Sequence, residues 1–481
     1  MLSSSLLHLI SLVQLAVAAP LSKKQEDRPA LTLGFSQRRT ASRHGQSLRS
    51  RAAAVALSPR QIADDDQQLY NLDDARYIVN ITLAGQELQV ILDSGSTDTY
   101  VYSVQPSNQY GDDPPPTFQN QSASPLYNTG LTYSASYGSG NGITTTYGAV
   151  QMSNILLDGS DFRANNLSFA NVYSTDNGVG ASGLLGLGFP LNGNIWTEAL
   201  TAIYASTKTK VSAAASASYF PIVPLLQAQG AITNAMYSLV VTRLGPQEAN
   251  NPKTSGGTIP LSPAATLSTG TLTIGNYPAG MTENQFTWSA VPTVTVSSQY
   301  VNYGFPASTG NRWTTQMQAV YFNGAKLINS QIQPEAGANY ALIDTGNPIM
   351  GIASDQLAQI TNAWAANPDN YVIPCDTAFD LVFQVGGVNF TMNATDVLVP
   401  SAAVIDSGNF GGYATSDCQA QMQPFTPTDN EIGPDTSQTY QLGDVFLRNV
   451  ITVFDYGSLT TASSNPPRLG FYSTTSAYAA L

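Results

Sequence analysis

One five-residue pattern occurs twice in this chain, and no other feature of the sequence limits the fold as strongly. Two apolar residues, an aspartate, a hydroxyl residue and a glycine occupy Ile91–Gly95 and, 251 residues later, Leu342–Gly346. Each copy is followed at a similar distance by an apolar-glycine pair, which ends at Gly186 and at Gly443. A repeat of this kind predicts two homologous lobes.

Past residue 70 the composition is typical of a β protein. Short runs rich in Val, Ile, Thr and Tyr, such as 77–83 and 450–454, alternate with turns rich in Gly, Asn and Asp. Helices are expected at few places, among them 197–205 and 354–366. With 481 residues, 42% of them hydrophobic, the chain is long enough for two large cores. We therefore predict a mainly β structure with an N-terminal and a C-terminal lobe, over residues 70–240 and 241–481.

The charge is distributed unevenly, and this distribution excludes some functions. The first 60 residues hold nine of the 19 basic side chains and two of the 32 acidic ones, so the remainder carries 10 basic and 30 acidic side chains. The strongly acidic composition of residues 61–481 argues against nucleic-acid binding. Both histidines, His8 and His44, also lie in the first 60 residues. A Ser-His-Asp or Cys-His catalytic site needs an imidazole base, and no histidine follows residue 60. Carboxylates therefore remain as the acid and base groups of a catalytic site.

The N-terminus has the features of an export signal. An apolar run over residues 6–18 is followed by small residues, which predicts a signal peptide over residues 1–19. This run is too short to span a membrane, and no later segment reaches about 18 uninterrupted apolar residues. We therefore expect a secreted, extracellular protein without a membrane anchor.

Residues 20–60 are basic, rich in Arg, Ser and Ala, and include the pair Arg38-Arg39. We interpret this segment as a removable pro-segment. A basic arm facing an acidic body can act as an electrostatic clamp that loosens when the carboxylates of the body are protonated. The alternative is a basic leader with no inhibitory role.

Export leads to two further expectations. Asn-x-Ser/Thr triplets are N-glycosylation sites in a eukaryotic secretory route, and they occur at Asn80, Asn120, Asn166, Asn389 and Asn393. The chain has only two cysteines, Cys375 and Cys418, which excludes a cysteine-rich metal site. In an oxidising compartment they would close a loop worth about 2–4 kcal/mol, and the alternative is two buried thiols.

Each aspartate of the repeat follows an apolar strand and precedes a tight turn. Glycine lets the backbone turn with its N–H near the carboxylate, and the hydroxyl fastens the loop. One such loop is an ordinary turn. Two in register predict that Asp93 and Asp344 meet at a pseudo-two-fold axis, where two nearby carboxylates cannot both ionise easily.

These motifs resemble those of the pepsin-type aspartic endopeptidases of the secreted fungal kind. Asp93–Asp98 resembles the first active-site loop of that family, and Ala341–Gly346 resembles the second. Tyr137–Gly140 resembles the hairpin flap whose tyrosine closes over the substrate. The glycine-bearing segments 183–188 and 442–447 resemble the strands behind the two loops, and the cysteines fall where the family's C-terminal lobe carries a disulfide.

The resemblance implies a pepsin-like acid-protease fold, with two pseudo-symmetric β-lobes on either side of a central cleft. It implies hydrolysis of peptide bonds at acidic pH by a water held between Asp93 and Asp344, one ionised as the general base and the other protonated. This chemistry uses no metal and no cofactor. The expected partners are a protein or peptide substrate in extended conformation and the chain's own pro-segment as inhibitor. A monomer is expected, because one chain supplies both aspartates.

The resemblance also assigns supporting roles. Ser94 and Thr345 would brace the loops across the axis, and Ser96 would hydrogen-bond the outer oxygen of Asp93. The complete set expected to support the loops is Ser94, Gly95, Ser96, Thr345, Gly346 and Asn347. The set expected in the substrate-binding flap is Tyr137 and Gly138.

The sequence departs from the family pattern at two places. Asn347-Pro348 stands where two hydroxyl residues are usual; Asn347 can still donate through its amide, but Pro348 removes an N–H beside the site. Tyr100 replaces a tryptophan that supports the flap tyrosine, and its phenol could take over that role. The second loop leaves open a catalytically weak or inactive pepsin-fold binding or inhibitory protein. A carboxylate-pair glycosidase is a third reading, which the symmetric loops do not favour.

Overall fold

The computed structural model describes the greater part of both predicted lobes. The described residues are 31–38, 69–72, 76–106, 116–119, 125–137, 144–157, 162–175, 181–241, 268–329, 339–364, 371–400, 417–425, 437–458 and 465–474. The predicted signal peptide, most of the predicted pro-segment, Asn120 and Gly138 lie outside these ranges.

Strands outnumber helices in both halves of the chain. The first half contains β1 (Leu31–Arg38), β2 (Leu69–Leu72), β3 (Arg76–Leu83), β4 (Gln86–Asp93), β5 (Tyr100–Tyr102), β6 (Tyr127–Tyr137), β7 (Thr144–Leu157), β8 (Arg163–Thr175), β9 (Gly183–Gly186), η2 (Pro190–Asn192), α2 (Asn194–Thr207), α3 (Ala213–Ala217), α4 (Ile222–Ala228) and β10 (Met236–Val241).

The second half contains β11 (Ser268–Ile274), η4 (Glu283–Gln285), β12 (Thr287–Ala290), β13 (Thr293–Thr295), α5 (Ser298–Tyr303), β14 (Ser308–Gly310), β15 (Thr314–Phe322), β16 (Ala325–Lys326), β17 (Asn339–Ile343), β18 (Met350–Ala353), α6 (Ser354–Ala363), β19 (Val372–Pro374), β20 (Leu381–Val385), β21 (Val388–Thr391), α7 (Ala394–Val397), β22 (Leu398–Pro400), β23 (Asp417–Ala420), β24 (Met422–Phe425), β25 (Ser437–Leu442), α8 (Asp444–Leu447), β26 (Val450–Asp455) and β27 (Arg468–Ser473). Helices α2 and α6 confirm the two helices expected from the sequence.

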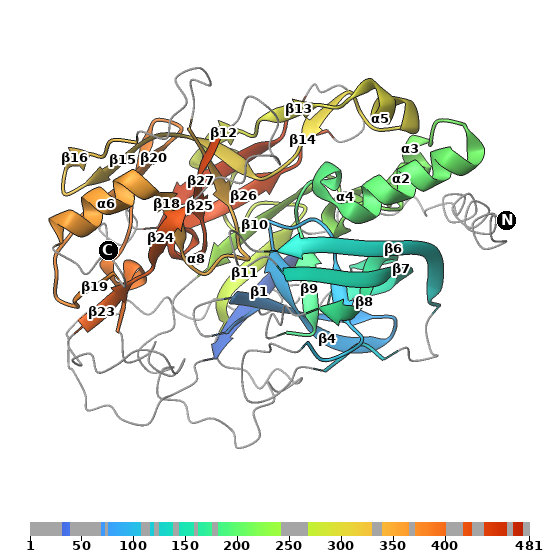
Figure 1. Ribbon diagram of the computed structural model, residues 1–481, viewed down its shortest axis with the longest axis horizontal. Coiled ribbons are helices and arrows are strands. Elements are labelled where there is room, and N and C mark those ends of the chain that lie inside the picture. Colours follow the sequence, from blue (N-terminus) through green and yellow to red (C-terminus); the bar gives the residue numbers. More distant parts are fainter. Residues whose placement is uncertain are drawn as a thin grey trace.

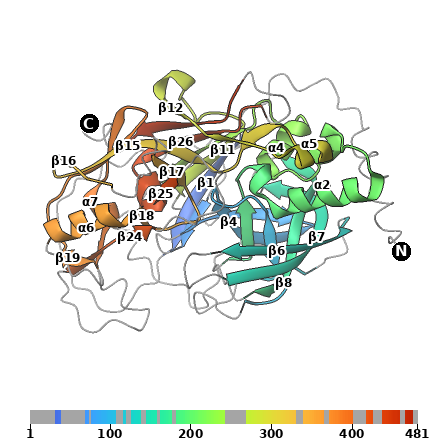
Figure 2. The same ribbon diagram turned by 45° about the horizontal axis from the view of Figure 1, so that its top comes forward.

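Two large sheets organise the molecule. A 14-stranded sheet has the order β12-β27-β26-β10-β11-β1-β2-β3-β4-β9-β5-β8-β7-β6, and an eight-stranded sheet contains β21-β20-β15-β17-β25-β18-β24 with β16 beside β15. Figure 1 shows the blue and teal strands with α2 on one side, and the orange and red strands with α6 on the other. Figure 2 gives the same division from a second direction. The mainly β, bilobal prediction is confirmed.

The strand that leads to Asp93 is buried on both faces. The hairpin from β3 to β4 turns at Ala84 and Gly85, both with positive φ, of 51° and 81°, as a tight two-residue turn requires. Strand β4 pairs antiparallel with β3 and parallel with β9, so that Asp93 is opposite Gly186. The last six residues of β4 are all buried, which agrees with their nearly continuous apolar sequence.

The strand that leads to Asp344 repeats this arrangement in the other lobe. Strand β17 pairs antiparallel with β15 and parallel with β25, with Ile343 opposite Leu442. The Asp344 N–H donates to the Leu442 carbonyl at 3.0 Å. The sequence repeat therefore corresponds to two equivalent strand pairs, each ending at an aspartate.

A buried aromatic cluster supports the first aspartate loop from the side of the C-terminal half. The Leu187 carbonyl accepts hydrogen bonds from Trp313 Nε1 at 2.7 Å and from the Tyr456 hydroxyl at 2.6 Å. The Leu187 N–H in turn donates to the Asp93 carbonyl at 2.8 Å. Trp313 and Tyr456 are almost fully buried, and their ring centroids lie 4.7 Å apart. Side chains from late in the chain thus fix the backbone next to Asp93.

Two further features bear on the sequence predictions. Cys375 and Cys418 form a disulfide, which confirms that reading and excludes two free thiols. Strand β1, which lies within the predicted pro-segment, pairs antiparallel with β11 and parallel with β2. Among the described residues, no helix is both long and apolar enough to cross a membrane.

Candidate active site

The two aspartate loops are tied together by reciprocal hydrogen bonds. The Ser94 N–H donates to Thr345 Oγ1 at 2.9 Å, and the Thr345 N–H donates to Ser94 Oγ at 3.0 Å. Each hydroxyl then donates to a strand carbonyl of the opposite lobe, Ser94 Oγ to Ile343 at 2.8 Å and Thr345 Oγ1 to Leu92 at 2.9 Å. These four contacts hold the two loops in one fixed geometry about a pseudo-two-fold axis.

The Asp93 carboxyl group receives three hydrogen bonds from its own loop. Its Oδ1 accepts from the Gly95 N–H at 2.7 Å and the Ser96 N–H at 3.0 Å, and its Oδ2 accepts from Ser96 Oγ at 2.6 Å. Only 7% of Asp93 is exposed. Ser96 therefore occupies the outer oxygen of this carboxyl group, where the sequence analysis expected it.

The Asp344 carboxyl group is bound differently. Its Oδ1 accepts from the Gly346 N–H at 2.8 Å, and its Oδ2 accepts from Gln441 Nε2 at 2.6 Å. Asn347 does not supply the donor expected of it, because its Nδ2 is buried without a hydrogen-bond partner in the described part of the chain. The Asn347 N–H bonds the Asp344 carbonyl instead, so this residue supports the loop through its backbone.

The two loop glycines leave room for the opposed carboxyl groups. A Cβ on Gly95 would lie 2.5 Å from Asp344 Oδ1, and a Cβ on Gly346 would lie 2.7 Å from Asp93 Oδ1. Contacts this short cannot be relieved without moving a carboxyl group, because the loops are fixed by their backbone bonds. Each lobe therefore places its aspartate against the glycine of the other.

The surroundings of Asp93, including the neighbouring Asp344, raise the pKa of its carboxyl group. Burial raises the pKa of Asp93 above its ordinary 3.8, and the charge of Asp344 raises it further. The hydrogen bonds from Ser96 and Gly95 oppose this rise, and the one to Asp344 adds to it. Because two negative charges so close repel each other, the two carboxyl groups cannot both ionise easily. The pair can therefore supply one general acid and one general base over the same pH range.

The predicted flap tyrosine lies at the end of β6, near three other phenols. The Tyr137 hydroxyl is 2.9 Å from the Tyr133 hydroxyl, and its ring centroid is 5.8 Å from that of Tyr100. The Tyr100 hydroxyl lies 3.4 Å from that of Tyr102. The sequence analysis gave the supporting hydrogen bond to Tyr100, whereas the structure gives a short one to Tyr133, which is 2% exposed. Tyr100 contributes ring packing.

Asp98 is a third buried carboxyl group in the first loop region. It lies at the N-terminus of α2, where its Oδ2 accepts from the Asn194 N–H at 2.7 Å and its Oδ1 from the Ile195 N–H at 3.3 Å. The N-cap residue of α2, Gly193, has no side chain for this purpose. Burial raises the pKa of Asp98 to about 7, although the two backbone bonds favour its ionised form.

Two residues of this site, Gln441 and Tyr133, were missed by the sequence analysis. Gln441 stands between buried Tyr440 and Leu442 on β25. A polar residue between two apolar ones just before a motif glycine was the available signal, because alternate residues of a strand face opposite sides. Tyr133 is four residues before Tyr137 on one strand, so the two side chains face the same side.

The described potential glycosylation sites differ in exposure. Asn389 is exposed on β21, while the Asn80 amide oxygen accepts from Gln89 at 3.2 Å. The Asn393 side chain caps α7 by accepting from the Thr395 N–H at 3.0 Å, and Asn166 has a positive φ of 53°.

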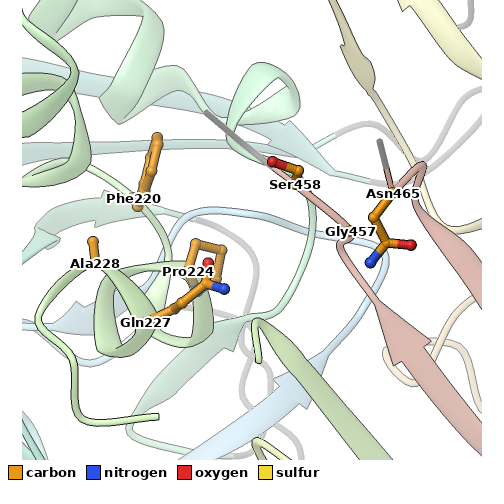
Figure 3. A pocket seen from close by; sticks show the side chains of 7 residues that line it. All are labelled: Phe220, Pro224, Gln227, Ala228, Gly457, Ser458 and Asn465. Atoms are coloured by element: carbon orange, nitrogen blue, oxygen red, sulfur yellow. The ribbon is translucent and has the colours of Figure 1, made fainter. Parts of the chain in front are cut away.

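A cavity of about 400 Å³ lies away from the aspartates, between α4 and the segment that follows β26. Figure 3 shows that Phe220, Pro224 and Gln227 face it from the helix side, with Ser458 and Asn465 opposite. No residue named at the aspartate site lines this cavity, so it forms no part of that site.

Known proteins resemble this chain in fold and in sequence. A solved structure, the aspartic proteinase from Irpex lacteus, superposes with a TM-score of 0.54 over 84% of this chain and 95% of that one, at 17% identity, which shows the shared fold. Cathepsin E-A of Xenopus laevis is 26% identical over 82% of this chain and 80% of its own length. Mucorpepsin of Rhizomucor pusillus is 23% identical over 95% of both.

A family model decides the assignment that these similarities suggest. The model of the eukaryotic aspartyl proteases matches residues 76–260 and again residues 261–464, which together make up most of the chain. The two matches follow the two halves of the internal repeat, with one aspartate loop in each. This chain therefore belongs to the eukaryotic aspartyl protease family and is an aspartic-type endopeptidase.

Proposed function

We propose that the protein is a secreted endopeptidase that cleaves proteins at acidic pH through a water activated by Asp93 and Asp344. The observation that supports this most directly is the opposition of the two carboxyl groups, each against the glycine of the other loop. The bonds of Ser94 and Thr345 across the axis make this geometry rigid before substrate binds. Such preorganisation is what general acid–base catalysis needs.

The reaction uses the single proton that the pair shares. The ionised carboxylate takes a proton from the water as the water attacks the scissile carbonyl carbon, and the protonated carboxyl group donates a hydrogen bond to the carbonyl oxygen. The carboxyl group that took the proton from the water then passes it to the leaving nitrogen, and the tetrahedral intermediate collapses with cleavage of the C–N bond. The pair returns to its starting form, and peptide plus water has become an acid and an amine.

The pH dependence follows from the same proton. In strong acid both carboxyl groups are protonated and the base is lost. As the pH rises, the pair loses its shared proton and the acid is lost. Because burial and the Asp344 charge raise the pKa of Asp93, the shared proton is retained to a higher pH than an isolated carboxyl group would allow.

We propose that residues 20–60 act as an inhibitory pro-segment, following the signal peptide over residues 1–19. Strand β1 of this segment lies between β11 and β2, so its backbone is bonded to the lobes it would inhibit. The segment carries nine basic residues, opposite in charge to the strongly acidic remainder of the chain. Protonation of that remainder in acid weakens the attraction and favours release. Activity measured at one pH before and after removal of the segment distinguishes an inhibitor from a passive leader.

Cleavage of an unfolded protein from pH 2 to 7 by the processed chain tests the proposed function. Wild type is compared with Asp344→Asn and with Asp380→Asn, a matched change at an exposed aspartate of the same lobe. We expect an acid optimum for wild type and Asp380→Asn, and loss of cleavage for Asp344→Asn. If the folded, processed chain cleaves at no pH, a pepsin-fold binding protein is favoured. The Asn347 amide, which has no partner among the described residues, agrees with that alternative.

A further inference from the structure

The two lobes bind the outer oxygens of their aspartates by different means. In the first loop the donor is local, because Ser96 follows Asp93 by three residues. At the equivalent place in the second loop, the amide nitrogen of Asn347 has no hydrogen-bond partner among the residues that the structure describes. The outer oxygen of Asp344 instead accepts from Gln441, 97 residues further along the chain, at 2.6 Å.

The strands next to the second loop are arranged to admit this glutamine. Gln441 lies opposite Leu342 of β17 and opposite Gly351 of β18. A Cβ on Gly351 would lie 3.1 Å from the Gln441 Cβ, so the glycine provides space for the longer side chain. Buried Tyr440 and Leu442 face the other side of β25, which directs Gln441 toward Asp344.

In the N-terminal lobe, whose loop has its own hydroxyl donor, a different residue occupies the position equivalent to Gln441. The residue equivalent to Gln441 is Leu184, since it lies opposite Ile91, two residues before Asp93, as Gln441 lies opposite Leu342. Leu184 is apolar and 4% exposed, and it faces Tyr100 where Gln441 faces Gly351. A glutamine is thus present only in the lobe whose loop lacks the serine.

We propose that Gln441 is a positioning residue of the catalytic pair, which holds the Asp344 carboxylate in place and favours its ionised form from a neighbouring strand. This assignment rests on the proposed function of the pair. A neutral amide donor stabilises a carboxylate without adding a titrating group. Gln441 therefore replaces the hydroxyl that the second loop lacks, and it helps to set the pH range in which the pair holds one proton.

The other groups that face the pair leave this range unchanged. Tyr100, Tyr137 and Tyr237 are the titratable side chains whose pKa values respond to the charges of the pair. Burial is the largest cause in each case and raises all three pKa values well above 10, so these phenols stay neutral in acid.

Two further buried carboxyl groups lie in neighbouring segments. Burial raises the pKa of Asp98 and the N–H groups of α2 lower it, whereas the charges of the pair are not among its causes. Asp444 is fully buried and its N–H donates to the Asn347 carbonyl at 2.9 Å, so the signals of the pair have to be distinguished from those of both residues.

The test compares Gln441→Leu with wild type in the processed chain. Leucine is the residue at the equivalent position of the other lobe, Leu184, so we expect this substitution to preserve the strand. The leucine variant lacks the hydrogen bond to the Asp344 carboxylate, so that carboxylate is protonated more readily. We expect the acid limb of the kcat/KM profile, where activity rises with pH, to move to higher pH by about one pH unit. Gln441→Glu moves it further, because an ionised neighbour disfavours a second negative charge. Gln89→Leu, at a buried glutamine of β4 that bonds Asn80, is the matched control.

A rescue variant separates the lost donor from a general disturbance. Asn347→Ser places a hydroxyl at the position equivalent to Ser96, and in the Gln441→Leu background we expect it to return the acid limb toward wild type. A double variant that keeps the shifted limb would overturn the assignment. So would a Gln441→Leu profile that overlays wild type, or a Gln89→Leu profile that shifts equally.

Carboxyl ¹³C titration of aspartate-labelled protein provides a readout that does not require cleavage. The signals of the pair are identified by their loss or shift in Asp344→Asn. We expect the titration of the pair in Gln441→Leu to move in the same direction and by the same amount as the activity limb. If wild type does not cleave, the proposed function is wrong. A shift of the carboxyl titration to higher pH in Gln441→Leu would still support the role of Gln441. An unchanged titration would overturn that role.

Discussion

Asp98 makes the stability of this protein depend on pH in a way that its geometry predicts. Its carboxyl group is 9% exposed and caps α2 through the N–H groups of Asn194 and Ile195. Burial raises its pKa to about 7, from 3.8 for a free carboxyl group. A group with a raised folded pKa stabilises the fold fully below its unfolded pKa, and this stabilisation is lost as the pH rises through the folded pKa. The window therefore runs from about pH 4 to pH 7.

The size of the effect follows from the shift. The difference between about 7 and 3.8 corresponds to about 4 kcal/mol of unfolding free energy at 1.36 kcal/mol per pH unit. Asp98→Asn removes the titration but keeps an oxygen that can accept from Asn194. We therefore expect the substituted protein to match wild type within about 1 kcal/mol below pH 4, and to exceed it by about 4 kcal/mol near pH 7.

Urea unfolding followed by intrinsic fluorescence, at intervals from pH 3 to 7.5, measures this difference. Both proteins carry Asp344→Asn, which prevents self-cleavage and leaves Asp98 untouched. Other titrating groups contribute equally to the two proteins, so the difference between their unfolding free energies isolates Asp98. A difference that stays constant with pH, or one in which wild type gains on Asp98→Asn as the pH rises, would refute the reasoning.

Two further predictions concern the aspartate site. Gly346→Ala places a Cβ 2.7 Å from Asp93 Oδ1, and we expect kcat to fall by at least a hundredfold with an unchanged fold by circular dichroism; near-wild-type turnover would contradict the packing. Tyr133→Phe removes the 2.9 Å contact to the Tyr137 hydroxyl, and we expect about a three- to tenfold loss of kcat/KM on a peptide substrate. The matched change Tyr147→Phe, at a tyrosine 48% exposed, should have no effect, and equal losses in both would contradict a role for Tyr133.

Much of the fold and of the pair could be predicted from the sequence, because the deciding signals are local. The apolar runs before Asp93 and Asp344 are typical of buried strands, and the glycine after each hydroxyl residue permits the tight loop. Their recurrence 251 residues apart required two equivalent lobes. The reciprocal bonds of Ser94 and Thr345 follow from this symmetry, since each hydroxyl occupies the same place in its loop.

The contacts that could not be predicted join residues far apart in the sequence or depend on the reach of a side chain. The loop sequence alone left Asn347 as the natural donor to Asp344, because an amide there has the right chemistry. Whether that amide reaches the carboxylate depends on the loop backbone, in which the Asn347 N–H bonds the Asp344 carbonyl. The resemblance likewise suggests Tyr100 as the hydrogen-bonding support of Tyr137, whereas the structure places the Tyr133 hydroxyl 2.9 Å from that of Tyr137.

The two lobes show that the hydrogen-bond donor to the aspartate carboxyl group can come from more than one position. It lies in the loop itself in one lobe and on a neighbouring strand in the other. In the N-terminal lobe Ser96 donates a hydrogen bond to Asp93. On the neighbouring strands β9 and β5, Leu184 lies opposite Tyr100. A glutamine at 184 would meet that ring and would duplicate a donor already present. In the C-terminal lobe Gly351 leaves the space, and Gln441 fills it and supplies the bond that the loop lacks. We therefore expect loss of a loop hydroxyl to be tolerated where the facing strand carries glycine. An unusual second loop in a related chain is then better judged together with the residues at these two strand positions than by the loop sequence alone.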